Sequence, residues 1–137
     1  MTDLIRRPAD HLPTREERGD RNAALTVYWL YLAAPFTVGI TGLVGALIAS
    51  GRRARAGAFG ASHFRHQVWT FGAATGASLT GGFWATTGGL ATVADRTGGD
   101  LVLAGAALAA TAGIGFVAST LFGLTRASGG EPVGRPE

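Results

Sequence analysis

The sequence contains no cysteine and no lysine, and over three long stretches it contains no ionisable side chain at all. Without cysteine, disulfide bonds, thiolate metal ligands and thiol catalysis are excluded. The chain also lacks an HExxH motif, a P-loop motif and paired carboxylates within the uncharged stretches. We therefore expect no enzyme activity, no catalytic residue and no cofactor.

The uncharged stretches are residues 23–50, 68–94 and 101–125. The first would extend about 40 Å as a helix, whereas the hydrocarbon core of a bilayer is about 30 Å thick. The sequence therefore predicts an all-α integral membrane protein with three transmembrane helices at these positions. The predicted membrane domain covers 23–125, between a polar, mobile tail at 1–22 and a polar tail at 126–137. Proton relays need ionisable groups inside the bilayer, so a proton-coupled transporter working alone is not expected.

Glycine is abundant, with 22 residues, and most of it lies inside the uncharged stretches. Small residues recur there at every fourth position, which allows another helix backbone to approach closely. Seven glycines are expected to line helix-packing faces: Gly42, Gly45, Gly72, Gly76, Gly81, Gly105 and Gly113. Pro35 cannot donate a hydrogen bond to the carbonyl of Tyr31, so a kink is predicted in the first transmembrane helix.

Two features near the first stretch predict local structure. Thr14 and Glu17 have the spacing of a capping box, which indicates a short helical turn within the N-terminal tail. Tyr28, Trp29 and Tyr31 cluster near the start of the stretch. Aromatic rings of this kind favour the headgroup level of a bilayer, so we expect them at the interface.

The connection at residues 51–67 has four arginines and no acid. Polybasic segments beside a membrane span attract anionic lipid, so Arg52, Arg53 and Arg55 are expected to face the lipid surface. The expected lipid partners therefore include anionic ones. The basic run is short and directly beside the membrane, so nucleic acid is not an expected partner.

The same connection carries four further polar residues, His63, Arg65, His66 and Gln67. We expect them to form an interfacial polar cluster that fixes where the second helix enters the membrane. His63 and His66 share a helix face, so a metal ion or a haem edge is an alternative. Arg65 disfavours a cation and no third ligand is evident, so no metal site is expected.

Three spans would place the N-terminal tail and the turn at 95–100 on one side, and the 51–67 connection and the C-terminal tail on the other. Each side would then hold six arginines. Arginines close to membrane ends set orientation most strongly. Those of the 51–67 side lie nearer the spans, so we expect this connection and the C-terminus in the cytoplasm and the N-terminus outside.

Residues 62–71, SHFRHQVWTF, resemble the hallmark of a family of small bacterial membrane proteins. That family is distantly related to a membrane subunit of the chloroplast inner-envelope import translocon. Tyr28, Leu30 and Tyr31 fit the opening of its first span. The chain departs from the family pattern at three positions, where it has His66 in place of an aromatic residue, Trp69 in place of arginine and Gly72 in place of tryptophan. The resemblance implies one span before the motif, two after it, and a location in the bacterial cytoplasmic (inner) membrane as a multi-pass protein.

Two classes of function follow. The first is a non-catalytic accessory or assembly subunit of a larger membrane protein complex, since three short helices cannot use so many small-residue faces among themselves. The second is an oligomeric channel or translocation component, which the distant kinship favours. The expected partners are membrane lipids together with other membrane subunits or further copies of the chain.

Overall fold

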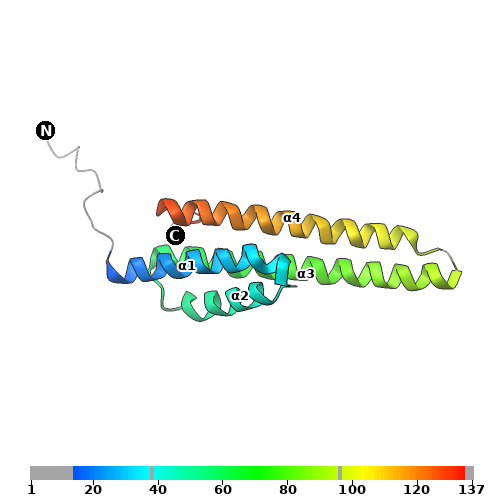
Figure 1. The fold of residues 1–137 in the computed structure, drawn as a ribbon, viewed down its shortest axis with the longest axis horizontal. Coiled ribbons are helices and arrows are strands. Elements are labelled where there is room, and N and C mark those ends of the chain that lie inside the picture. The colour runs from blue at the N-terminus through cyan, green and yellow to red at the C-terminus, as the bar shows by residue number, and fades with distance from the viewer. Residues whose placement is uncertain (1–13, 38, 96, 135–137) are drawn as a thin grey trace, which may run out of the picture.

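In the computed structural model the described part of the chain is almost entirely helical (Figure 1). The described residues are 14–37, 39–95 and 97–134. They form four α-helices and one 3-10 turn: α1 (Arg15–Ala33), η2 (Ala34–Thr37), α2 (Ile40–Arg53), α3 (Ala58–Asp95) and α4 (Gly99–Gly129). The predicted all-α fold is confirmed.

The capping box predicted at the start of the chain is present. The Glu17 backbone N–H donates to the Thr14 hydroxyl at 3.2 Å, and the Glu17 carboxylate accepts from the Thr14 N–H at 2.7 Å. These bonds satisfy donors that a helix start leaves open. Helix α1 begins here, so residues 15–22 are helical, and the prediction of a mobile tail as far as residue 22 is wrong. Residues 1–13 lie outside the described residues.

The stretch 23–50 was predicted to be one helix, but it contains parts of two helices that pack against each other. Helix α1 ends at Ala33, and the N–H of Ala34 bonds to the carbonyl of Tyr31. Pro35 follows and has no N–H to continue the α-helical pattern. Gly39 then adopts a left-handed conformation with φ of 84°, which favours glycine. The predicted kink at Pro35 is therefore a reversal of the chain.

Helices α1 and α2 form an antiparallel hairpin (Figure 1). Near its tip Gly42 lies beside Ala34, and further along Gly45 lies beside the Tyr31 ring. Within the tip, the N–H of Gly39 donates to the carbonyl of Ala34 at 2.8 Å. The Thr37 hydroxyl is also bonded, to the hydroxyl of Thr41 at 2.8 Å. The reversal therefore satisfies several of its polar groups within the chain.

Helices α3 and α4 are longer than the stretches 68–94 and 101–125 and form a second antiparallel hairpin. Their backbones come very close at glycine. A Cβ on Gly81 would lie 2.6 Å from the Gly105 carbonyl oxygen, and one on Gly88 would lie 2.6 Å from that of Gly98. These contacts require glycine, since an added Cβ would displace backbone atoms. Among the described residues, α4 alone is both long and apolar enough to cross a membrane, judged by length and composition.

The α1–α2 hairpin covers only half of the α3–α4 hairpin (Figure 1). The buried apolar core lies in this covered half and includes Val27, Tyr31, Ala49 and Phe64. The other half, which we call the distal half, consists of α3 and α4 alone. It ends at the short connection between them.

The start of α1, the segment between α2 and α3, and the end of α4 meet at one end of the molecule, which we call the polar end. Two contacts fix this arrangement. The Arg21 Nε donates to the carbonyl of Ala127 at 3.1 Å. The Gly57 N–H donates to the Asp20 carboxylate at 2.9 Å. The expectation that the N-terminal segment and the 51–67 connection lie at opposite ends is therefore wrong. The hairpin at 34–39 turns the chain back.

Candidate functional site

The polar end holds a buried set of hydrogen-bonded side chains from α1 and α3. Tyr28 and Tyr31 come from α1, and His63 and Gln67 come from α3; all four are buried. The Tyr28 hydroxyl lies 3.0 Å from His63 Nδ1, and the Tyr31 hydroxyl donates to the Gln67 carbonyl at 2.9 Å. The Gln67 amide donates to the Ala24 carbonyl at 2.9 Å. We call these four residues the polar cluster.

His63 also binds the segment after α4. Its Nε2 lies 2.9 Å from the carbonyl oxygen of Glu131. A carbonyl can only accept, so Nε2 carries the proton and Nδ1 accepts from the Tyr28 hydroxyl. Both ring nitrogens are therefore satisfied by a neutral imidazole. Burial lowers the pKa of His63, because it disfavours the charged form, while the Glu131 hydrogen bond opposes this shift.

The polar tail predicted at 126–137 begins within α4, and the described segment after the helix is fixed by further contacts. The Val133 N–H donates to the Ser62 hydroxyl at 3.3 Å. Arg126 forms an ion pair with Glu131 at 3.6 Å and donates to the Pro132 carbonyl at 3.1 Å. The described part of this tail therefore folds back onto the start of α3.

The structure separates the four residues of the predicted interfacial cluster. His63 and Gln67 are fully buried between helices. His66 is half-buried and bonds through Nε2 to the Ser119 carbonyl of α4 at 3.2 Å. Arg65 is also half-buried and lines a surface cavity together with His66. The buried Oε1 of Gln67 has no hydrogen-bond partner among the described residues.

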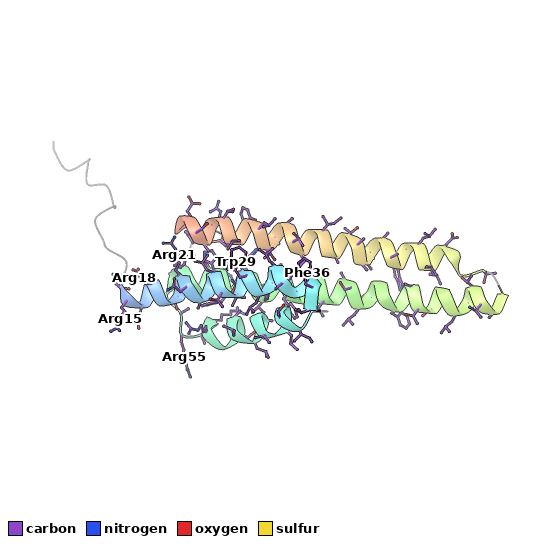
Figure 2. All side chains as sticks on the ribbon, in the orientation of Figure 1. Arg15, Arg18, Arg21, Trp29, Phe36 and Arg55 are labelled. Carbon is purple, nitrogen blue, oxygen red and sulfur yellow. The ribbon has the colours of Figure 1, made fainter. Side chains whose placement is uncertain are left out.

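Tyr28 and Tyr31 were expected at a membrane interface, yet they are 1% and 0% exposed. Trp29, between them, is 63% exposed and points outward (Figure 2). Each tyrosine ring packs against a glycine, Tyr28 against Gly123 of α4 and Tyr31 against Gly45 of α2. The sequence signal that distinguishes them is helical spacing, because Ala24, Val27 and Tyr31 share the buried face of α1.

The seven glycines predicted to pack helices fall into two groups. An added Cβ at four of them would meet a neighbouring element at about 3.0 Å or closer: Gly42, Gly45, Gly81 and Gly105. An added Cβ at the other three would meet nothing within 4 Å: Gly72, Gly76 and Gly113. These three face outward from the chain.

Eight of the twelve arginines lie in the described residues, and by their positions on the helices all eight lie at the polar end. They are Arg15, Arg18, Arg21, Arg52, Arg53, Arg55, Arg65 and Arg126. Figure 2 labels four of them there. Four acids share this end: Glu16, Glu17, Asp20 and Glu131. Arg52, Arg53 and Arg55, expected to face lipid, are exposed at the end of α2 and just after it.

No protein-family profile matches the chain, and no curated protein or solved structure shows significant similarity to it. The chemistry of the site therefore rests on its own geometry. No group of three metal-ligating side chains occurs within the described ranges. The Nε2 atoms of His63 and His66 are both hydrogen-bonded to backbone carbonyls. The arrangement is suited to holding helices and a tail segment together.

An apolar hollow lies under the tip of the α1–α2 hairpin, where the distal half begins. Its volume is about 520 Å³. Its lining includes Pro35 and Gly39 from the tip, Phe71 and Leu79 from α3, and Phe116 from α4. The hollow is open at the side and offers apolar contacts.

Proposed function

We propose that this chain is an integral protein of the bacterial cytoplasmic membrane that acts as a non-catalytic accessory or assembly subunit of a larger membrane complex. In this arrangement α4, the one described helix that is long and apolar enough to span, crosses the bilayer together with its hairpin partner α3. The α1–α2 hairpin enters from the polar end without crossing. The proposal replaces a third span with a half-depth hairpin. The resemblance of residues 62–71 to small bacterial membrane proteins supports the same location.

The observation that carries the proposal is the apolar surface of the distal half. Large hydrophobic side chains there are exposed, including Leu79 at 70%, Val93 at 88% and Ile114 at 72%. Water would oppose such continuous exposure, since soluble monomers rarely expose apolar patches beyond a few hundred Å². Lipid tails or other membrane helices are the environment that suits it.

The lengths of the elements fit a bilayer. The uncharged part of α3, residues 68–94, spans about 40 Å and α4 spans about 46 Å, against about 30 Å for the hydrocarbon core and 40–45 Å with headgroups. Helix α2 extends only about 21 Å, so the hairpin tip would lie within the core. Phe36 at the tip is 89% exposed, which suits contact with lipid (Figure 2).

The charge distribution supports one orientation. All eight described arginines lie at the polar end, while by sequence only Arg96 falls in the connection between α3 and α4. Positively charged residues beside spans remain on the cytoplasmic side. We therefore propose that the polar end, including the start of α1, faces the cytoplasm and that the α3–α4 connection faces outside.

The subunit role is supported by glycine faces that the chain does not use itself. Gly72 and Gly76 lie one turn apart on α3 and face outward, as does Gly113 on α4. Small residues at this spacing are the common contact between membrane helices. A partner helix, from another protein or a second copy, would be able to approach α3 and α4 closely there.

Single-cysteine labelling tests the membrane arrangement, because the chain has no native cysteine. Asn22→Cys lies at the polar end and Gly99→Cys lies beside the α3–α4 connection; both positions are exposed. A membrane-impermeant thiol reagent applied to intact spheroplasts should label Gly99→Cys only. Labelling of both would indicate three spans with the N-terminus outside. Recovery of the protein in the soluble fraction without detergent would refute the membrane location.

The subunit role is tested separately by affinity purification in mild detergent followed by mass spectrometry. A stoichiometric membrane complex is expected to copurify with the tagged chain. The alternative, an oligomeric channel, predicts instead that the purified chain alone conducts ions or solutes in liposomes. Conductance without a copurifying complex would overturn the accessory role.

A further inference from the structure

We propose that α3 and α4 hold one anionic phospholipid lengthwise along their outer face. Its phosphate lies beside Arg65 and His66 at the polar end, and one acyl chain runs along a furrow toward Ala77. The inference depends on the membrane location proposed above, and it adds a defined site and a ligand class.

The headgroup part of the site is a cavity of about 470 Å³. Ser62, Arg65, His66 and Trp69 of α3 line it, together with Val133 and Gly134 of the folded-back tail. An arginine side chain presents several N–H donors in a planar fork that matches a phosphate. Trp69 is 71% exposed beside it, as is common for tryptophan at the headgroup level.

The acyl-chain part is a second cavity of about 270 Å³. Its lining is small and mostly apolar, with Ala73 and Ala77 from α3 and Ala112 and Gly115 from α4. Gly115 leaves the furrow open, since an added Cβ there would meet nothing within 4 Å. Such a trough accepts a flexible hydrocarbon chain.

The two cavities follow each other along one face. His66 and Thr70, which line the first and the second, are four residues apart and therefore share a helix side. The hydrogen bond from His66 to the Ser119 carbonyl lies between them, because Ser119 lines the second cavity. From Arg65 to Ala77 the helix rises about 18 Å, close to the roughly 15 Å depth of one leaflet's hydrocarbon.

The order of charge, aromatic ring and apolar furrow identifies the ligand as an amphiphile. A soluble anion would use only the cavity beside Arg65, whereas the apolar furrow beyond it suits a hydrocarbon chain. A lipid with a negative headgroup is favoured over a zwitterionic one, because the polar end carries eight described arginines and only four described acids.

Native mass spectrometry of protein released from nanodiscs tests the site. The nanodiscs contain equal amounts of phosphatidylglycerol and phosphatidylcholine. Arg65→Ala and Gly115→Leu remove the headgroup contact and fill the furrow. Arg65→Ala is expected to reduce retained phosphatidylglycerol about fivefold, the change expected for loss of one arginine–lipid contact. Gly115→Leu is expected to reduce it as well, because leucine would fill the furrow.

Two matched variants control for charge and for bulk. Arg55→Ala removes an exposed arginine from the same end, and Gly72→Leu adds a side chain on α3 outside the furrow. Arg55→Ala should lose much less phosphatidylglycerol than Arg65→Ala, and Gly72→Leu should retain it as the unmodified chain does. Equal loss in Arg65→Ala and Arg55→Ala would overturn the site, as would equal retention of the two lipids by the unmodified chain.

The outcome is separable from that of the membrane proposal. Cysteine labelling of the same variants reports insertion independently of lipid retention. Correct labelling with unchanged retention in Gly115→Leu would reject the lipid site and leave the membrane arrangement intact. A variant that fails to insert is replaced by Gly115→Val, which adds a smaller side chain at the same position.

Discussion

At the scale of single residues, His63 joins three segments that are distant in the sequence. His63 lies on α3. It accepts a hydrogen bond from the Tyr28 hydroxyl of α1 and donates one to the carbonyl of Glu131 after α4. His63 and Gln67 were predicted, with Arg65 and His66, as an interfacial polar cluster, whereas the structure buries these two between helices. Their tyrosine partners were not predicted, because an aromatic residue near a helix start satisfies both an interfacial and a buried assignment.

Acidification is expected to destabilise the fold through His63. Burial lowers its pKa below the ordinary value of 6.5, and the nearby His66 and Arg126 act in the same direction. The unfolded chain then binds a proton at a higher pH than the folded chain does. The stabilisation from neutral His63 is therefore complete above the ordinary pKa and is lost as the pH falls below it. Thermal unfolding in detergent between pH 8 and pH 5 measures this loss.

Two substitutions isolate the histidine. His63→Gln should lower stability at pH 8 but remove part of the loss on acidification. Tyr28→Phe should cost about 1 kcal/mol, for the lost hydroxyl contact, and should keep the pH dependence. A pH dependence of His63→Gln equal to that of the unmodified chain would contradict the assignment.

At the scale of elements, the reversal between α1 and α2 was the largest departure from the prediction. Hydropathy is continuous through residues 23–50, so it cannot reveal where a helix turns back. The local signals were present in Pro35 and Gly39, but a membrane proline is usually tolerated within a helix. What decides the outcome is tertiary packing, since Gly42 and Gly45 allow α2 to lie against α1.

The helix ends illustrate a second limit of hydropathy. The uncharged stretches predicted the positions of α3 and α4 but underestimated the lengths of both helices. Arg65 and His66 end the apolar run, yet charged residues do not end a helix, and α3 begins earlier, at Ala58. Glycine spacing likewise identified faces without showing which of them is used within the chain.

Gly39→Ala should weaken the hairpin. The left-handed conformation with φ of 84° costs about 1–2 kcal/mol for a residue with a side chain. Gly51→Ala in α2 is the matched control, because its added Cβ meets nothing within 4 Å and alanine favours a helix. Equilibrium unfolding in mixed micelles should show the loss for Gly39→Ala alone. Equal stability of the two variants would argue against the left-handed turn.

Gly81→Leu should affect folding, whereas Gly76→Leu should affect association with a partner. Leucine at Gly81 would meet the Gly105 backbone, so it should destabilise the α3–α4 hairpin by about 1–3 kcal/mol. An added Cβ at Gly76 would meet nothing within 4 Å, so with leucine there folding should be unchanged while crosslinking to a partner falls. Unchanged crosslinking in Gly76→Leu would remove this face from the proposed subunit contact.

At the scale of the whole molecule, the fold determines at which end the arginines gather. Three successive spans divide the arginines six against six. The two hairpins instead bring all eight described arginines to the polar end. The sequence predicted the helical class and identified the basic segments. The end of the molecule at which the arginines gather depends on one turn, which composition could not locate.

Replacing Arg52, Arg53 and Arg55 with alanine distinguishes these arrangements. In the three-span arrangement the substitution leaves three arginines against six and should invert the protein. In the proposed arrangement five described arginines remain at the polar end, so orientation should not change. Labelling of Gly99→Cys in the substituted background measures it. Loss of external labelling would contradict the proposed arrangement.

The short connection between α3 and α4 has a consequence for biogenesis. In the proposed arrangement this connection is the polar segment of the described chain that must be exported, and by sequence it contains few charges. The segments before α1 and after α4 would stay where the ribosome releases them. Insertion would then require a single translocation event, in which α3 and α4 enter together as a loop and the first hairpin follows from the same side.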